Sequence, residues 1–182
     1  MRLRITCLLM CLASLVFGQQ GKPEGGDTSQ SSGAEQRLFR GDEPFRTPSP
    51  LSLEALSAIL ATREGKQGLE DAKHRGIADI ASRFSATNIY LHDSHQAQLL
   101  VIGKSPFSGA DNDWFWLLSS HSGVRVLLFC GGNSLEIMKD GAAGYQDVRC
   151  VWYGPNTEKE ELYRYDGRVY KLSKRSWRAS TD

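Results

Sequence analysis

From residue 86 onward, apolar and polar side chains alternate along the chain, and this alternation constrains the fold more than any other feature. Turn-forming residues separate one alternating segment from the next. Short strands with this spacing predict an antiparallel meander. The predicted strands cover residues 87–91, 98–102, 114–119, 124–130, 135–138, 147–153, 161–165 and 168–172.

Two helices are expected before these strands. Ser49-Pro50 is typical of a helix start, with Ser as the N-cap and Pro at the first helical position. Apolar residues from Leu53 to Leu60 then fall on one helical face. Gly65 and Gly68 predict a break, and three- and four-residue apolar spacings predict a second helix over residues 69–84.

Within the predicted strands 114–119 and 124–130, residues 114–118 and 126–129 are apolar at successive positions and therefore on both faces. Such strands are central and covered on both sides, and the helices supply one cover. The sequence thus predicts an α+β fold for a single domain at residues 50–178. One or two N-terminal helices are expected to pack on an antiparallel β-meander of six to eight short strands.

Asp166-Gly167 is the preferred sequence for a two-residue type I′ turn. That turn places Tyr163 opposite Tyr170, so that Tyr163, Tyr165 and Tyr170 share one face of the sheet. Together with Trp177 they form a candidate binding face, because Tyr and Trp dominate interface anchors. The alternative is that the tyrosines belong to the core.

The N-terminus reads as a cleavable signal peptide at residues 1–18. Arg2 and Arg4 precede an apolar run over residues 5–17, and small residues favour cleavage before Gln19. A transmembrane span needs roughly 20 apolar residues, so no span is expected. Cys11 leaves lipidation open. The predicted location is therefore secreted or periplasmic.

Residues 19–49 are rich in Gly, Ser, Gln, Glu and Pro. Such a segment buries too little apolar surface to offset its ordering entropy, so we expect a disordered linker. The tripeptide Arg40-Gly41-Asp42 inside it matches a cell-adhesion motif, and we interpret the match as coincidence.

Signal cleavage removes two Arg and no acid, which takes the net charge from +1 to −1. This balance lacks the basic excess of a nucleic-acid-binding protein, so no nucleic-acid partner is expected. Only Cys130 and Cys150 remain after cleavage. In an oxidising compartment a lone cysteine pair forms a disulfide, and the alternative is two buried thiols.

Few residues suggest chemistry. His92, Asp93 and His95 share one predicted turn and could ligate a metal or serve a hydrolase, although a polar hairpin loop has the same composition. Residues 111–113 lack the spacing of a calcium loop and predict an Asx-rich turn. The basic C-terminal stretch, residues 168–178, indicates either a solvated terminus or contact with an acidic partner. No catalytic residue, metal site or cofactor is predicted.

Residues 97–172 resemble a family of uncharacterised exported bacterial proteins. The matching pieces are a Leu-Leu-Val strand, a Gly-Ala-x-Asn loop before a Trp, a Gly-Tyr-x-Asp-Val segment and a closing Tyr-x-Tyr-Asp-Gly-x-x-Tyr. Family members often carry cysteines beside the loop, where this chain has Phe107 and Asp113. The resemblance implies an exported β-rich domain and no particular chemistry. The pieces lie at residues 99–101, 109–116, 144–148 and 163–170.

From these features we expect a non-enzymatic binding or interaction module of the cell envelope, whose partner is an envelope polymer or another exported protein. The alternative is a hydrolase, with or without a metal, that uses the turn containing His92, Asp93 and His95.

Overall fold

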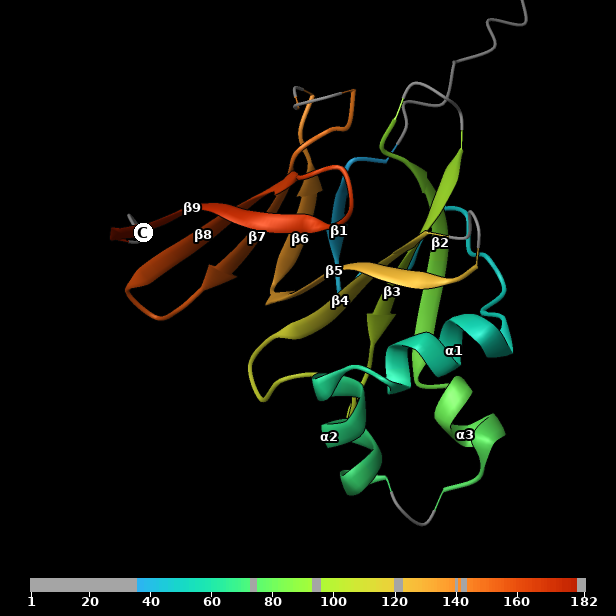
Figure 1. The fold of residues 1–182 in the computed structure, drawn as a ribbon. Helices are drawn as coiled ribbons and strands as arrows, with labels where there is room; N and C mark the ends of the chain where they lie inside the picture. Colours follow the sequence, from blue (N-terminus) through green and yellow to red (C-terminus); the bar gives the residue numbers. More distant parts are fainter. Residues whose placement is uncertain are drawn as a thin grey trace, which may run out of the picture. The chain divides into compact units, whose positions relative to one another are not determined.

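The computed structural model describes residues 36–72, 75–92, 96–119, 123–139, 141 and 144–179. These residues form nine strands in two antiparallel sheets, together with three short helices (Figure 1).

The first sheet is a four-stranded meander in the order β2-β3-β4-β5, and the helices cover one of its faces. Strand β4 shows how both faces are filled. Trp116 and Leu118 pack with the helices, whereas Phe115 and Leu117 pack with the second sheet. The prediction that this strand is covered on both sides is confirmed. The elements are α1 (Leu53–Leu60), α2 (Arg63–Asp71), α3 (Ile77–Ala81), β2 (Phe84–Tyr90), β3 (Ala97–Gly103), β4 (Asp113–Ser119) and β5 (Arg125–Gly132).

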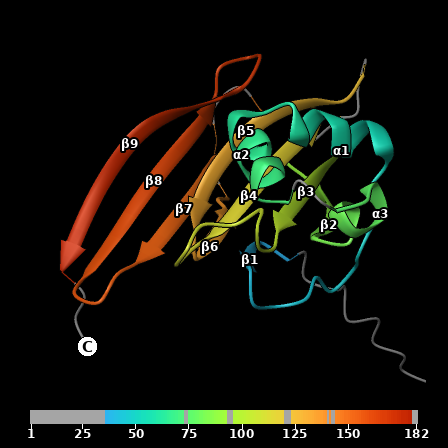
Figure 2. The same cartoon turned by 90° about the horizontal axis from the view of Figure 1, so that it is seen from below.

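The second sheet has the order β1-β6-β7-β8-β9, and β9 is one of its edges. In Figure 2, β8 and β9 lie on the side farthest from the helices. The predicted Cys130–Cys150 disulfide is present, and it joins β5 of the first sheet to β7 of the second. The strands are β1 (Leu38–Arg40), β6 (Ser134–Ile137), β7 (Val148–Tyr153), β8 (Thr157–Tyr165) and β9 (Tyr170–Ala179).

The chain passes between the sheets at the corner formed by Gly131, Gly132 and Asn133. The Asn133 amide donates to the Val151 carbonyl at 2.7 Å. A Cβ atom at Gly132 would lie 2.7 Å from the same carbonyl oxygen, so a side chain there would collide with β7. Glycine therefore lets β5 approach β7 closely enough to continue into β6.

The predicted fold class, α+β with helices on a single meander, is wrong. The structure is mostly β, with two antiparallel sheets in place of one and three helices in place of one or two. The first six predicted strands lie close to β2–β7, whereas β8 begins four residues before the predicted 161–165 and β9 runs seven residues beyond the predicted 168–172. The error has a physical cause, because alternation shows that a strand has two unlike faces but does not show which sheet it joins.

Residues 36–49, the described part of the predicted linker, are not disordered. They carry β1, which pairs with β6, and Phe39 and Phe45 are both buried. Their rings contact each other edge-on, with centroids 5.9 Å apart. Two phenylalanines therefore anchor a segment that its polar composition predicts to be free.

The helices also differ from the prediction. Helix α1 begins after Ser52, whose hydroxyl accepts from the Ala55 amide at 3.1 Å, and not at Ser49. Gly65 and Gly68 lie inside α2 instead of breaking it. A Cβ atom at Gly68 would lie 2.3 Å from the Phe107 ring, so the glycine permits close packing. The second helix predicted over residues 69–84 is replaced by the end of α2, by α3 and by the start of β2.

The final hairpin has a different register from the one predicted. Tyr165 pairs with Tyr170 and Tyr163 with Leu172, a shift of two residues. The loop covers residues 166–169, and the Asp166 carboxylate accepts from the amides of Arg168 and Val169 at 2.8 Å. This side-chain cap stabilises a longer loop than a two-residue turn. A shift of two preserves the faces, so the tyrosines still share one side of the sheet.

Candidate functional site

The face of the second sheet that looks toward the first sheet is built from cross-strand rows. Because β7, β8 and β9 pair in register, each row contains one residue from each strand. Nearest the hairpin loop is the pair Tyr165–Tyr170. The next three rows are Val148–Tyr163–Leu172, Cys150–Glu161–Arg175 and Trp152–Lys159–Trp177.

The tyrosine end of this face belongs to the core. Tyr170 is buried, and its hydroxyl donates to the Gln146 carbonyl at 2.9 Å. Tyr165 stacks on Tyr145 with ring centroids 4.1 Å apart, and Tyr163 packs against the same core. Of the four residues in the predicted binding face, Trp177 alone is largely exposed, at 64%. The three tyrosines are therefore core residues, which was the alternative interpretation of the sequence.

Glu161 marks the boundary between the covered and uncovered parts of the face on β8, whereas on β9 the uncovered part already begins at Leu172, which is 45% exposed. It is buried, and its carboxylate accepts from the Tyr163 hydroxyl and binds Lys159 and Arg175, all within 2.8 Å. Burial opposes the charged form, but the hydrogen bonds and the charge of Lys159 outweigh it, so the pKa of Glu161 lies below its usual value. Burial and the Glu161 carboxylate raise the pKa of Tyr163. These contacts keep the Glu161 side chain charged and ordered.

The last row places a lysine between two tryptophans. The Lys159 ammonium lies 3.3 Å from the centroid of the Trp152 ring and 5.7 Å from that of Trp177. Both distances fall within the range of cation–π attraction. The Lys159 side chain is 12% exposed, so the two rings and Glu161 shield most of it from water.

A pocket of about 300 Å³ lies beside this row, and we call it the tryptophan pocket. Asn133 fixes one wall by accepting from the Tyr153 amide at 2.7 Å and donating to the Asp111 carbonyl at 3.2 Å. Tyr153 is 56% exposed at the rim. The complete lining is Asp111, Asn112, Asn133, Trp152, Tyr153, Gly154, Thr157, Lys159 and Trp177.

Two side chains of the pocket lining, which we call its floor, each carry a buried polar atom without a partner among the described residues, Asn112 Oδ1 and Trp152 Nε1. Both side chains lie against Gly131, within 3.7 Å of where its Cβ would stand. A Cβ at Gly109 would lie 2.0 Å from Asn112 Oδ1, so glycine makes room for the amide. An unpaired buried donor and acceptor each cost about 1–3 kcal/mol, which makes this floor a site that a hydrogen-bonding group would stabilise.

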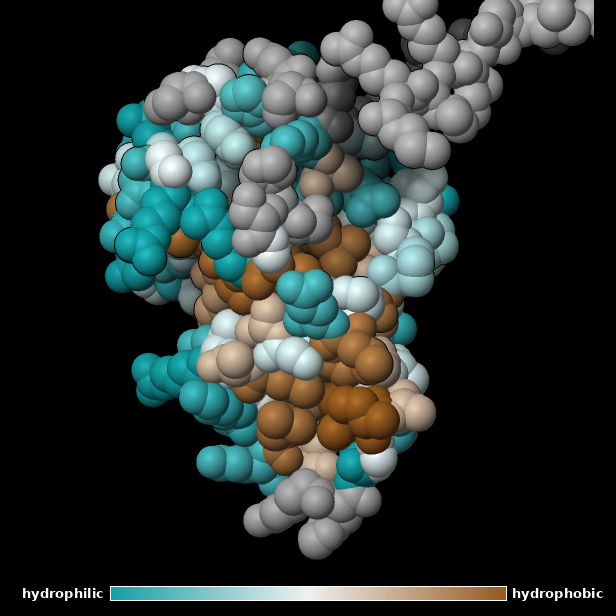
Figure 3. Space-filling model, turned by 45° about the vertical axis from the view of Figure 1, so that its right-hand side comes forward, coloured by the Kyte–Doolittle hydropathy of each residue, from teal (hydrophilic) through white to brown (hydrophobic). Residues whose placement is uncertain are grey.

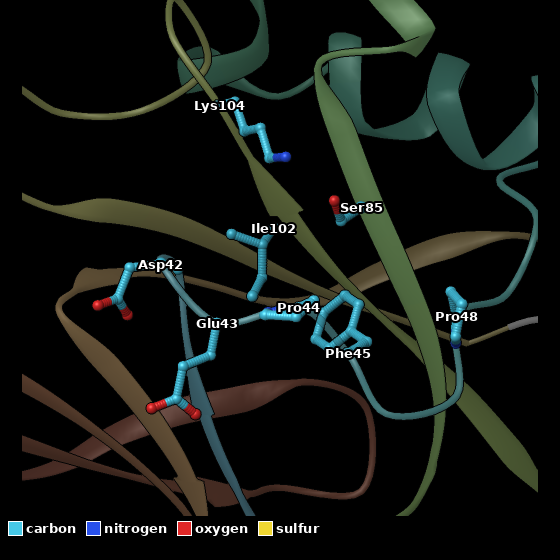
Figure 4. Close-up of a pocket in the computed structure, with 9 residues that line it drawn as sticks. Asp42, Glu43, Pro44, Phe45, Pro48, Ser85, Ile102 and Lys104 are labelled. Atoms are coloured by element: carbon cyan, nitrogen blue, oxygen red, sulfur yellow. The ribbon is translucent and has the colours of Figure 1, made fainter.

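A second pocket, of about 330 Å³, lies under the strap formed by residues 41–48 (Figure 4). The strap crosses β2 and β3, and the Thr87 hydroxyl donates to the Thr47 carbonyl at 2.7 Å. In Figure 4 the carboxylates of Asp42 and Glu43 point away from the Lys104 ammonium. Phe45 is the aromatic residue of the lining and is buried, as is Ile102, whereas Pro44 and Pro48 are exposed, so this pocket presents no exposed aromatic surface.

The Arg-Gly-Asp tripeptide, which spans the end of β1 and the start of the strap, makes contacts within the fold. Arg40 pairs with Glu43 at 2.9 Å, and the Asp113 carboxyl group fills the space where a Gly41 side chain would stand. Burial and the nearby charge of Asp42 raise the pKa of Asp113, although a hydrogen bond from the Gly41 backbone opposes the shift. These contacts favour the interpretation that the adhesion match is coincidental.

Apolar side chains gather on the surface over α1 and α3 (Figure 3). Leu53 is 72% exposed and Ile77 is 57% exposed. Exposed apolar patches often mark contact surfaces.

Of the histidine turn, the structure describes His92, whereas Asp93 and His95 lie outside the described residues. His92 forms a β-bridge with Tyr145, and their ring centroids are 4.6 Å apart. The hydrolase alternative therefore stays a prediction. Among the described residues, no cluster of three or more His, Cys, Asp or Glu side chains has metal-binding geometry.

Comparison with protein-family models, with curated proteins and with solved structures finds no match to this chain. The resemblance drawn from the sequence motifs therefore stays a prediction. Within the described ranges, no helix combines the length and apolar character that a membrane crossing requires.

Sequence reasoning predicted Trp177 as a site residue but missed the rest of the tryptophan pocket. Residues 111–113 are predicted only as an Asx-rich turn, yet Asp111 and Asn112 line the pocket together with Asn133. The register of β7, β8 and β9 joins Trp152, Lys159 and Trp177 from positions up to 25 residues apart. The longer hairpin loop and the bulge between Leu162 and Tyr163 together align Lys159 with Trp177.

Proposed function

We propose that this chain is an exported, non-enzymatic binding module of the cell envelope, and that the tryptophan pocket is its binding site. The observation that carries the proposal is the exposure of Trp177 and Tyr153 beside a pocket with polar walls. Water contact with large aromatic surfaces is unfavourable, at roughly 25 cal/mol per Å². Exposed aromatic rings grouped with polar side chains are typical of recognition surfaces.

The pocket groups are arranged for binding more than for proton transfer. Both polar atoms of the Asn133 side chain form hydrogen bonds with the backbone, and the Lys159 ammonium contacts Glu161 and the Trp152 ring. Each is therefore fixed in position before a ligand arrives. A fixed site lowers the entropy cost of binding.

Export is supported by the disulfide and by the N-terminal sequence. The bond between Cys130 and Cys150 joins the two sheets, and such bonds persist in oxidising compartments. The short apolar run at residues 5–17 behind Arg2 and Arg4 is typical of a signal peptide. We expect the exported protein to begin at Gln19, which N-terminal sequencing of secreted material tests.

Co-sedimentation with isolated cell envelope of the native host tests the binding function. We expect the mature protein and Tyr90→Ala to sediment with the envelope, whereas Trp177→Ala stays in the supernatant. Tyr90 is the matched control because it is an aromatic residue, 45% exposed, on the other sheet. Sedimentation of all three proteins would place the site elsewhere, and sedimentation of none would overturn envelope binding.

A further inference from the structure

We propose that the tryptophan pocket binds a neutral saccharide ring, which stacks on Trp177 and hydrogen-bonds to the opposite wall. This inference rests on the proposed binding function and specifies its ligand class. A pyranose ring has an apolar C–H face and a rim of hydroxyl groups. The pocket offers a flat aromatic surface and a set of amide and carboxylate groups, which match those two parts.

The stacking surface is the indole ring of Trp177. It is 64% exposed, and it stands on β9, an edge strand of the second sheet. Its strand neighbour in the same row is Lys159, which pairs with it in register. The ring is therefore open to solvent while the row beneath it is held in place.

A cationic ligand does not suit this site, because a cation already occupies it. The Lys159 ammonium lies over the Trp152 ring at 3.3 Å and also lies within reach of Trp177, at 5.7 Å from the ring centroid. An incoming ammonium group would meet a like charge at the position where ring attraction is strongest.

An anionic ligand finds no excess positive charge in the pocket. The cation in the pocket lining is Lys159, which pairs with Glu161 at 2.8 Å, and Glu161 also pairs with Arg175 at 2.7 Å. Asp111 adds a second acidic residue to the pocket lining. Two cations and two carboxylates leave this region balanced, so a neutral ligand is the best electrostatic match.

The floor of the pocket favours hydroxyl groups in particular. Trp152 Nε1 is a donor without an acceptor, and Asn112 Oδ1 is an acceptor without a donor among the described residues. Both side chains lie against Gly131. A hydroxyl group donates and accepts at once, so the hydroxyl rim of a sugar offers the kind of partner that each of these atoms lacks.

Tryptophan fluorescence and calorimetry of the mature protein test this inference. The probes are the β-1,4-linked hexasaccharides of glucose and of N-acetylglucosamine, with polygalacturonate as the anionic probe and spermine as the cationic probe. We expect a neutral hexasaccharide to change the emission and to bind with measurable heat. Trp177→Ala should weaken that binding at least about tenfold, Trp177→Phe should restore most of it, and Tyr90→Ala should leave it unchanged.

Three results overturn the saccharide proposal: no binding of either neutral hexasaccharide, binding of the charged probes only, or sugar binding that Trp177→Ala leaves intact. Competition in the sedimentation assay separates this proposal from the binding function. Envelope binding that needs Trp177 but resists an excess of both hexasaccharides overturns the saccharide and keeps the function, with an envelope protein as the remaining ligand. If the wild-type protein does not sediment with the envelope, the binding function and the saccharide proposal are both overturned.

Discussion

On one face of the second sheet, the two ends of β8 and β9 differ in burial. At the loop end of β8 and β9, Tyr165 and Tyr170 pack into the core between the sheets. At the far end of the same strands, Trp177 is exposed in the tryptophan pocket. Both ends carry aromatic residues on the same face, so residue type does not separate them. The difference comes from cover, because the first sheet packs on one end and leaves the other open.

The boundary between the two ends is polar. Glu161 pairs with Cys150 on β7, whose disulfide reaches the first sheet, and its carboxylate binds Lys159 and Arg175 on the open side. A buried carboxylate is tolerated only when it is paired, and this one has both cations and a tyrosine hydroxyl. The comparison predicts that substitutions lose stability in the covered half and binding in the open half.

The largest effect is expected at Tyr170. Tyr170→Ala removes a buried ring and its hydrogen bond to Gln146, and should lower the free energy of unfolding by about 3–5 kcal/mol. Tyr170→Phe keeps the ring and should cost about 1 kcal/mol. Urea unfolding followed by circular dichroism measures both. Equal losses for the two variants would show that packing does not define the covered half.

The second largest loss of stability is expected when the disulfide is removed. Replacing Cys130 and Cys150 together by Ser opens a loop with a sequence separation of 20 residues. In the chain-entropy model this costs about 3 kcal/mol. Urea unfolding of the double variant measures the loss, and wild-type protein under reducing conditions is its control. An unchanged unfolding midpoint in both samples would contradict a stabilising bond between the sheets.

The next prediction concerns Glu161, which lies between the covered and the open part of the sheet face. Glu161→Gln removes charged hydrogen bonds to a buried group and should cost about 1–3 kcal/mol at neutral pH. The folded pKa of Glu161 is lowered, so its contribution is complete above the usual pKa of Glu and is lost as the pH falls through the folded pKa. The wild type should therefore lose more stability on acidification than Glu161→Gln. Parallel pH profiles of the two proteins would refute this role.

The smallest effect on stability is expected at Trp177, where function should change most. Trp177→Ala removes a largely exposed side chain and should alter the free energy of unfolding by less than about 0.5 kcal/mol. Envelope binding should be lost in the same variant. Thermal unfolding beside co-sedimentation measures both properties. A drop in stability comparable to that of Tyr170→Ala would show that the open half is also core.

Much of the local structure was predictable. The alternating segments located eight strands, because side chains on a strand point to opposite faces and a buried face selects apolar residues. The cysteine pair was predictable from the expected compartment. Strand β1 escaped because three residues in a polar segment give too short a pattern, although Phe39 and Phe45 marked the segment.

The candidate site was predictable only in part. Trp177 stood out as an aromatic residue in a basic stretch, but its partners depend on register. The Asp166 cap lengthened the hairpin loop, and a bulge between Leu162 and Tyr163 shifted the strands again. Register follows from such local details and from packing, which a single sequence reveals weakly.

The order of side chains along each strand determined which residues share a face, since that order is a property of the covalent chain. The tertiary structure alone decided which part of that face is core and which is open. The reason is that a side chain is buried only when another segment of the chain packs against it. The first sheet packs over Tyr170 and does not extend over Trp177. Contacts between segments distant in sequence set that limit.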